Sequence, residues 1–256
     1  MINTTLQELL PLAITAAQAA SLEILNVYHS GDFKTEAKGD QSPLTQADKR
    51  AHAIITSLLQ SAQLPVLSEE GRDIPYHERK AWEYFWMVDP LDGTKEFVKR
   101  NGEFTVNIAL IHQQQPMLGV VMVPVSGDLF YASQGTGAFV KRNNQIIPLP
   151  VRKPIDLTQP GIRVVASRSH MSDETQAFIH SLYEPHLVSQ GSSLKFMLLA
   201  EGKADVYPRF APTMEWDTAA AHAIANEAGI AVLQKDSHQP LQYNKPDLLN
   251  PYFICK

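Results

Sequence analysis

The chain has a single cysteine among its 256 residues, Cys255, next to the last position. An intrachain disulfide and a cysteine-based metal cluster are therefore excluded. Basic residues are also relatively few, with 22 Lys and Arg against 27 Asp and Glu, and they form no continuous stripe. The net charge of −5 argues against nonspecific binding of nucleic acid, although a local site for a small anion is compatible with it.

Signals for export and membrane insertion are scarce as well. No Lys or Arg precedes Lys34, so the positively charged start of a secretory signal is missing. The uncharged stretch from Leu9 to Leu22 is too short to span a bilayer. Together with the single cysteine, these absences predict a soluble cytoplasmic protein without a transmembrane segment.

Internal repeats, low-complexity linkers and charged tails are lacking, so nothing in the sequence marks a domain boundary. Hydrophobic residues make up 44% of the chain, which is typical of a globular protein with a substantial core. We therefore expect a single domain over residues 1–256.

Hydrophobic periodicity predicts an α/β protein whose strands and helices pack in layers. The segment Thr45-Gln-Ala-Asp48 has the pattern of a capping box at the start of a helix. Helices are expected from Leu6 up to a polar loop at 30–43, and over 51–60, 173–183, 191–202 and 216–229. Strands are expected over 65–70, 84–88, 104–111, 117–124, 129–133, 162–166 and 204–207, with a hairpin around 142–145.

The stretch Val-Asp-Pro-Leu-Asp-Gly-Thr-Lys-Glu-Phe, residues 88–97, is the most informative part of the chain. It sets Asp89 and Asp92 three residues apart around a proline. Gly93 and Thr94 follow at the expected start of a short helix, where their backbone N–H groups would point at an anion. Carboxylates are the ligands that Mg²⁺ prefers, so the stretch suggests metal-assisted phosphate chemistry. The alternative is a plain turn, which Asp and Gly both favour.

Four acids fall at the ends of predicted elements: Glu69 after one strand, Asp89 and Asp92 after another, and Asp217 at the start of a helix. If they converge, they form an all-oxygen site for two or three Mg²⁺ ions, with the carbonyl of Leu91 as a further ligand. Each acid also has a structural alternative, since Asp217 can cap its helix and Glu69 can be a solvated loop residue. Chance could place one of these acids at the end of an element, but it explains the placement of all four much less well.

Asp48 has two compatible interpretations. As the acid of a capping box it is structural. Its carboxylate can also pair with the hydroxyl of Thr94, and the two would then orient and help to deprotonate an attacking water. Because a carboxylate accepts several hydrogen bonds, both roles can coexist.

A second anion or nucleotide site is suggested later in the chain. Ser167-Arg-Ser-His170 follows a strand, Gly191-Ser-Ser-Leu-Lys195 begins a predicted helix, and Tyr207-Pro-Arg209 follows another strand. Hydroxyls, a helix opened by glycine and cationic side chains suit a phosphate and a ribose. The alternative for Lys195 and Arg209 is an ordinary surface charge.

The acid motifs resemble those of the Mg²⁺-dependent, Li⁺-sensitive inositol monophosphatase and fructose-1,6-bisphosphatase superfamily. The matching segments are Ser68-Glu69-Glu70, Asp89-Pro-Leu-Asp-Gly-Thr94 and Trp216-Asp217-Thr-Ala-Ala220. Within the superfamily, Lys95-Glu96-Phe97, the run 99–110, Gly191-Ser-Ser-Leu-Lys-Phe196 and Tyr207-Pro-Arg-Phe210 are most similar to the bacterial bisphosphate nucleotidases.

The resemblance implies a layered αβαβα sandwich and assigns roles to residues. Asp48 and Thr94 would activate the water. Glu69, Asp89, the Leu91 carbonyl, Asp92 and Asp217 would bind Mg²⁺. The substrate would contact part of that cluster together with the later segments, through Glu69, Leu91, Asp92, Gly93, Thr94, Ser167, His170, Gly191, Lys195 and Asp217.

The implied reaction is hydrolysis of the 3′-phosphate of adenosine 3′,5′-bisphosphate to AMP and phosphate, and of the same phosphate of 3′-phosphoadenylyl sulfate, in sulfur assimilation. Peripheral association with the cytoplasmic face of the inner membrane is implied by the resemblance alone. The sequence leaves open a monomer or a homodimer. It also leaves open an inositol or sugar monophosphatase of the same fold, or a noncatalytic nucleotide or metal sensor.

Overall fold

The computed structural model describes residues 5–31, 36–37, 43–166 and 171–256. Its helices are α1 (Leu6–Ser30), α2 (Gln46–Leu59), the 3₁₀ turn η1 (Gln60–Ala62), α3 (Tyr76–Arg79), α4 (Thr94–Val98), α5 (Asp173–His180), α6 (Leu194–Ala200) and α7 (Glu215–Glu227). Its strands are β1 (Glu36–Ala37), β2 (Pro43–Leu44), β3 (Val66–Ser68), β4 (Tyr84–Asp92), β5 (Thr105–His112), β6 (Gln115–Met122), β7 (Leu129–Ser133), β8 (Gly137–Arg142), β9 (Gln145–Pro148), β10 (Arg163–Ala166), β11 (His186–Ser189), β12 (Tyr207–Arg209), β13 (Val232–Gln234) and β14 (Phe253–Cys255).

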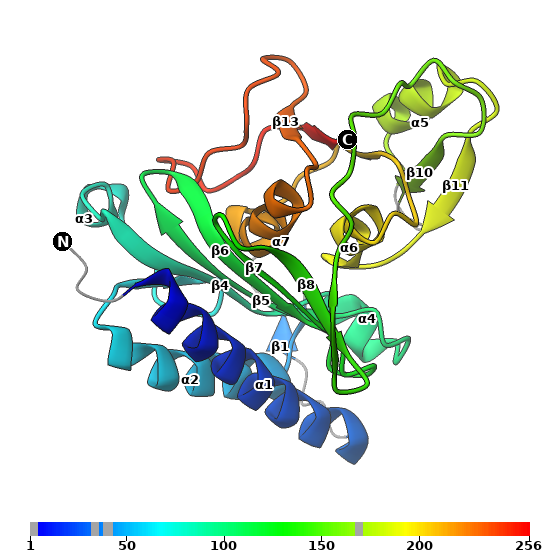
Figure 1. Ribbon diagram of the computed structural model, residues 1–256. Helices are drawn as coiled ribbons and strands as arrows, with labels where there is room; N and C mark the ends of the chain where they lie inside the picture. The colour runs from blue at the N-terminus through cyan, green and yellow to red at the C-terminus, as the bar shows by residue number, and fades with distance from the viewer. Residues whose placement is uncertain (1–4, 32–35, 38–42, 167–170) are drawn as a thin grey trace.

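A seven-stranded sheet forms the centre, in the order β3-β4-β5-β6-β7-β8-β9. Its strands pair antiparallel, except that β3 and β4 run parallel. Helices α1 and α2 cover one face, and α7 crosses the other face with α6 beside it (Figure 1). Beyond them lie the sheets β10-β11 and β12-β14-β13, which a parallel bridge between Val164 and Val206 joins, and then α5. The predicted layered αβαβα sandwich is confirmed.

Two hydrophobic clusters fix the layers around the large sheet. One contains the inward residues of α1 and α2 with Trp86, Val106 and other residues on one face of the sheet. The second lies between the opposite face and α7, whose alanines at 219–221 allow the helix to lie close to the strands. At Gly119 of β6, an added Cβ would come within 2.1 Å of the carbonyl oxygen of Ala220, so this contact requires glycine.

Helix α1 is longer than the uncharged stretch of residues 9–22. By length and composition it is the one helix in the described part of the chain that is long and apolar enough to cross a membrane. The argument that the segment is too short to span a bilayer is therefore wrong. Packing accounts for part of its apolar character, because Leu9, Ala13 and Ile24 are buried against α2 and the sheet, and 39% of its most apolar 18-residue window is buried.

Most predicted elements are present, with shifted boundaries. The capping box is confirmed: the backbone N–H of Thr45 donates to Asp48 Oδ2 at 2.8 Å. The expected helix from Gly191 begins only at Leu194, and Ser192 has a φ of 51° that is incompatible with a helix. The expected strand at 204–207 is displaced to Tyr207–Arg209. The polar loop at 30–43 contains the short strand β1, and β2 begins at its last residue, Pro43.

His222 of α7 is a buried histidine with a hydrogen-bond partner in the core. It is 1% exposed, and its Nδ1 lies 2.8 Å from the hydroxyl of Tyr243. Burial lowers the pKa of His222 from 6.5 to about 4. Between these two pH values the unfolded chain binds a proton that the folded protein does not, so stability is lost as the pH falls through this window.

We therefore expect acid to destabilise the protein partly through His222. Its contribution to the free energy of unfolding should fall by about 3 kcal/mol between pH 6.5 and pH 4. Urea unfolding of the wild type and of His222→Gln at several pH values isolates the contribution of His222 to the pH dependence of stability. The carboxylates are the same in the two proteins and titrate alike. An equal pH dependence of the two proteins would show that His222 is not responsible.

Candidate active site

The ends of β3 and β4 bring three of the four predicted acids together. Because β3 and β4 are parallel, their carboxyl ends meet at one edge of the sheet. Glu69 follows β3 there, and its backbone N–H donates to the carbonyl of Val88 at 3.1 Å. Glu69, Asp89 and Asp92 all line one cavity of about 420 Å³. The sequence placed these acids at strand ends, and the parallel pairing explains why they converge.

A bulge in β4 puts Asp89 and Asp92 on the same side of the sheet. Residues three apart on a regular strand face opposite sides. Here Asp89 pairs with Asn107 and Asp92 with Thr105, so β4 contains one residue more than β5 over this interval. Pro90 has no backbone N–H and cannot donate a hydrogen bond to the neighbouring strand, so it suits a bulge, where the pairing is interrupted. The backbone N–H of Leu91 donates to Asp89 Oδ1 at 3.0 Å and holds the turn.

Asp217 reaches the same cavity from the opposite layer. It lies in the first turn of α7, and its Oδ2 accepts a hydrogen bond from the backbone N–H of Met214 at 2.9 Å. The capping role considered for Asp217 is therefore real. It is compatible with a place in the acid cluster, since Asp217 lines the cavity together with Glu69 and Asp89.

Asp92 is held by residues that the sequence analysis did not single out for this role. Its Oδ2 accepts hydrogen bonds from the Ser192 hydroxyl at 2.6 Å, the Ser193 N–H at 2.8 Å and the Ser193 hydroxyl at 2.9 Å. Asn107 approaches the same oxygen at 3.4 Å. Because all of these bonds fall on Oδ2, the carboxylate has a fixed orientation. The only sequence signal was the Gly-Ser-Ser segment itself.

The cluster concentrates negative charge away from water. Burial, followed by the charges of Glu69, Asp92 and Asp217, raises the pKa of Asp89 well above its usual range. Burial, and then the charge of Asp92, raises the pKa of Asp217 to about 8. Neighbouring buried carboxylates without a counter-charge are unfavourable, and a divalent cation removes the conflict.

The donor set therefore fits Mg²⁺, which prefers oxygen ligands. No group of three His, Cys, Asp or Glu side chains within the described ranges is arranged to hold an ion as it stands. Asp89, Asp92 and Asp217 each use an oxygen to accept a backbone N–H. Loading with metal would thus be accompanied by adjustment of these side chains, and the ligand set stays a prediction.

Asp48 and Thr94 meet beside the acids, as predicted. Asp48 is 1% exposed, and its Oδ2 accepts from both the N–H and the hydroxyl of Thr45. Its other oxygen, Oδ1, lies 3.2 Å from the hydroxyl of Thr94, which is also 3.3 Å from the carbonyl of Leu91. A carboxylate is the stronger acceptor, so the single hydroxyl hydrogen favours Asp48. The lone pairs of Thr94 can then accept a hydrogen bond from a water.

A second cavity, of about 540 Å³, adjoins the first, and its walls contain the cations Lys99, Lys195 and Arg209 as well as the acids Glu96 and Glu103. The two share Asp92, Gly93 and Asp217 in their walls. Lys195 is 8% exposed, and burial lowers its pKa to about 8. The surface-charge alternative for Lys195 is thus wrong.

The other predicted substrate residues have different outcomes. Gly191 lines the second cavity but lies ahead of α6 rather than in it. An added Cβ there would come within 2.9 Å of the carbonyl oxygen of Glu103, so the close approach needs glycine. Gly93 has a φ of 93° and directly precedes α4. Ser167 and His170 lie outside the described residues.

Comparisons with known proteins agree with this arrangement. Residues 5–255 match the model of the inositol monophosphatase family. The chain is 47% identical over 244 residues to the 3′(2′),5′-bisphosphate nucleotidase CysQ of Salmonella typhimurium, covering 93% of this chain and 95% of that protein. It is 46% identical, with the same coverage, to the CysQ nucleotidase of Escherichia coli K12. The crystal structure of CysQ from Bacteroides thetaiotaomicron superposes with a TM-score of 0.86 and 47% identity, covering 99% of this chain and 98% of that one.

Proposed function

The chain belongs to the inositol monophosphatase family, and we propose that it is a Mg²⁺-dependent 3′(2′),5′-bisphosphate nucleotidase. Its substrate would be adenosine 3′,5′-bisphosphate, from which it removes the 3′-phosphate to leave AMP and phosphate. Identities of 46–47% over 93% of the chain to proteins named as such nucleotidases support this activity.

The observation that carries the substrate assignment is the pair of adjoining cavities. The first is lined by the acid cluster, the second includes Lys195 and Arg209 among its lining residues, and both have Asp92 and Asp217 in their walls. A bisphosphate nucleotide has two phosphates on one ribose. One phosphate would lie over the acids while the remaining phosphate meets the cations. A simple monophosphate would use only the first cavity.

The acids would hold Mg²⁺ through Glu69, Asp89, the Leu91 carbonyl, Asp92 and Asp217. When bound, such ions lower the pKa of a water and neutralise charge on the phosphoryl group and the leaving oxygen. The protein's own share of the chemistry is orientation and proton transfer. Thr94 accepts a hydrogen bond from the attacking water and passes a proton toward Asp48, whose Oδ1 it already faces.

The same site would accept 3′-phosphoadenylyl sulfate, because the two nucleotides share the 3′-phosphate and differ at the 5′ end. Hydrolysis of either compound places the enzyme in sulfur assimilation. The number of metal ions, a cytoplasmic location, peripheral association with the inner membrane and the choice between monomer and homodimer stay predictions.

A substrate panel tests the assignment. Purified protein with Mg²⁺ should release phosphate from adenosine 3′,5′-bisphosphate with a higher kcat/KM than from inositol 1-phosphate or a sugar monophosphate. A preference for the inositol ester would contradict the nucleotide assignment while retaining the family. No phosphate release from any of these compounds would favour a sensor.

Substitution of Lys195 should separate the two cavities. Lys195→Ala removes a buried cation, so KM for adenosine 3′,5′-bisphosphate should rise about ten- to a hundredfold, the range for losing a hydrogen bond to a charged group. KM for a simple phosphate ester should change little. Lys203→Ala is the matched control, since Lys203 is exposed and pairs with Glu201. Equal effects of Lys195→Ala on both substrates would argue against a nucleotide role.

A further inference from the structure

Glu215 is a fully buried acid that belongs to neither cavity. Its exposure is 0%, and it lies two residues before Asp217 at the start of α7. Residues two apart on a helix point in different directions, so the two carboxylates do not face the same space. A buried charge is costly unless it is paired and hydrogen-bonded. The partners of Glu215 therefore indicate what it does.

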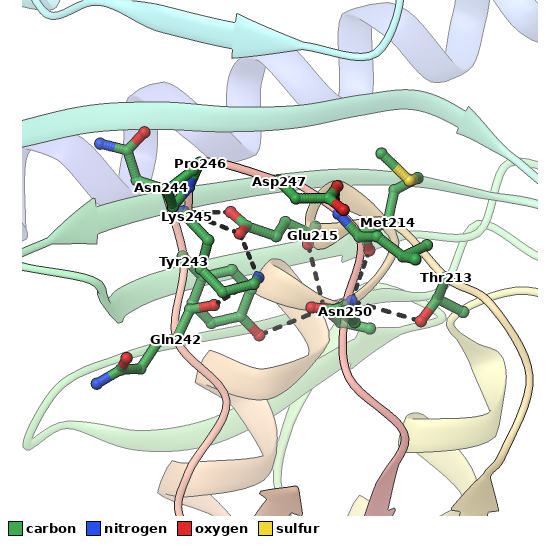
Figure 2. A network of polar contacts seen from close by, with 12 residues as sticks. Thr213, Met214, Glu215, Gln242, Tyr243, Asn244, Lys245, Pro246, Asp247 and Asn250 are labelled. Atoms are coloured by element: carbon green, nitrogen blue, oxygen red, sulfur yellow. Dashed lines mark hydrogen bonds and ion pairs between the residues drawn. The ribbon is translucent and has the colours of Figure 1, made fainter. Parts of the chain in front are cut away.

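Those partners come from one segment, residues 242–250, here called the strap. The carboxylate of Glu215 accepts hydrogen bonds from the backbone N–H groups of Asn244 and Lys245, and it pairs with the ammonium group of Lys245. Figure 2 shows the carboxylate of Glu215, at the start of α7, next to Asn244 and Lys245 of the strap. The strap contains one isolated β-bridge, between Leu249 and Met214, and no strand or helix, so the bonds to Glu215 fix the part of it that has no such pairing.

Arg79 holds the strap from the side of α3. Its guanidinium donates to the Asn244 side-chain oxygen and to the Lys245 carbonyl, both at 2.7 Å. Arg79 is itself 3% exposed. The strap is thus fixed between α3, which precedes β4, and the first turn of α7. Glu215 supplies the contact on the α7 side.

The far end of the strap returns to the residues that carry Asp217. The carbonyl of Leu248 accepts the Glu215 N–H at 2.9 Å. Asn250 donates its N–H to the Thr213 carbonyl and its side-chain amide to the Met214 carbonyl, each at 2.8 Å. Met214 in turn donates its N–H to Asp217 Oδ2. Glu215 is therefore hydrogen-bonded to one end of the strap, and the other end is hydrogen-bonded to Met214, whose N–H donates to Asp217. Figure 2 shows the part of this arrangement from Glu215 to Asn250 and Met214.

We propose that Glu215 is a positioning residue, which anchors the strap so that Asp217 is held facing Asp92 and Asp89 and thereby sets the affinity of the acid cluster for Mg²⁺. The inference rests on the proposed function only in taking the cluster as a Mg²⁺ site. Residues that orient metal ligands typically change metal affinity by about ten- to a hundredfold when they are replaced.

Glu215→Gln tests the proposal because it keeps the shape of the side chain and removes its charge. Binding of Mg²⁺ to the full-length protein, measured by calorimetry without nucleotide, should weaken about tenfold. With bisphosphate nucleotide as substrate, the Mg²⁺ concentration for half-maximal activity should rise by the same factor. The value of kcat at saturating Mg²⁺ should change little, because Glu215 lines neither cavity.

Glu227→Gln is the matched control at the other end of α7. Glu227 accepts two backbone hydrogen bonds, from Gly135 and Gly137, so its loss also costs stability. It should lower the melting temperature without changing Mg²⁺ binding. If Glu215→Gln behaves like this control, Glu215 is merely structural and the proposal is overturned.

Asn250→Ala covers the case in which Glu215→Gln does not fold. It breaks the bond from the strap to Met214 and leaves the buried ion pair intact. Weaker Mg²⁺ binding supports the proposal, and wild-type binding refutes it. Since calorimetry needs no nucleotide, a protein that binds Mg²⁺ but hydrolyses no bisphosphate nucleotide would contradict the proposed function and leave this inference standing.

Discussion

Asp89→Asn is expected to reduce kcat for adenosine 3′,5′-bisphosphate by about a thousandfold, the upper end of the range for removing one electrostatic contact to the transition state. Asp89 lies at the centre of the acid cluster, and the charges of Glu69, Asp92 and Asp217 all act on it. An asparagine of the same shape keeps the oxygen that accepts the Leu91 N–H but removes the charge that would bind the metal. Phosphate release over a range of Mg²⁺ concentrations measures the effect.

The same substitution is expected to stabilise the metal-free protein. A raised pKa means that the unfolded chain releases the Asp89 proton before the folded protein does, so stability is lost as the pH rises above the usual carboxyl range. At neutral pH Asp89→Asn removes this penalty, and a gain of ~1 kcal/mol would raise the melting temperature by about 2–4 °C in a protein of this size. The gain should disappear near pH 4.

Asp205→Asn is the control for these two effects. Asp205 is a half-buried acid that pairs with Arg163 and Arg152, outside both cavities. Its replacement should lower the melting temperature and leave kcat unchanged. Turnover retained by Asp89→Asn would remove Asp89 from the metal site.

Thr94→Val is expected to lower kcat about a hundred- to ten-thousandfold, the range for losing general acid–base assistance. The hydroxyl lies 3.2 Å from Asp48, and valine replaces it with a methyl group of similar size. The cavities keep their shape, so KM should change little. Stability should change by only about 1 kcal/mol, since Thr94 makes few hydrogen bonds.

Thr94→Ser restores the hydroxyl and should recover most of the lost kcat. The comparison separates the hydroxyl from the methyl group of Thr94. If valine and serine at this position give the same kcat, the pair with Asp48 plays no part in activating water.

Local signals made part of this site predictable. The capping box at Thr45 and Asp48 is written within four residues, and its geometry is present as expected. The acids of β4 follow an apolar run that ends in Asp-Pro-Leu-Asp-Gly. Their position at the end of a strand could therefore also be predicted from the adjacent residues. Such features depend on residues a few positions apart.

Contacts between distant segments could not be read in this way. Asp92 is bonded to Ser192 and Ser193, a hundred residues later, and Glu215 to the strap. No periodicity links such segments, because their proximity results from the packing of α7 on the sheet and of α6 against α7. Composition and spacing only suggested that the acids converge. The resemblance to a known family is what predicted it.

The bulge in β4 has a consequence for variation at this site. Asp89 and Asp92 share a cavity only because one extra residue shifts the phase of the strand between them. Chain length at residues 90–91 is therefore as important for the acid cluster as the two carboxylates themselves. Substitutions that keep this length leave the acids in phase, whereas loss of a single residue would send Asp92 into the opposite helix layer with every acid in the sequence still present.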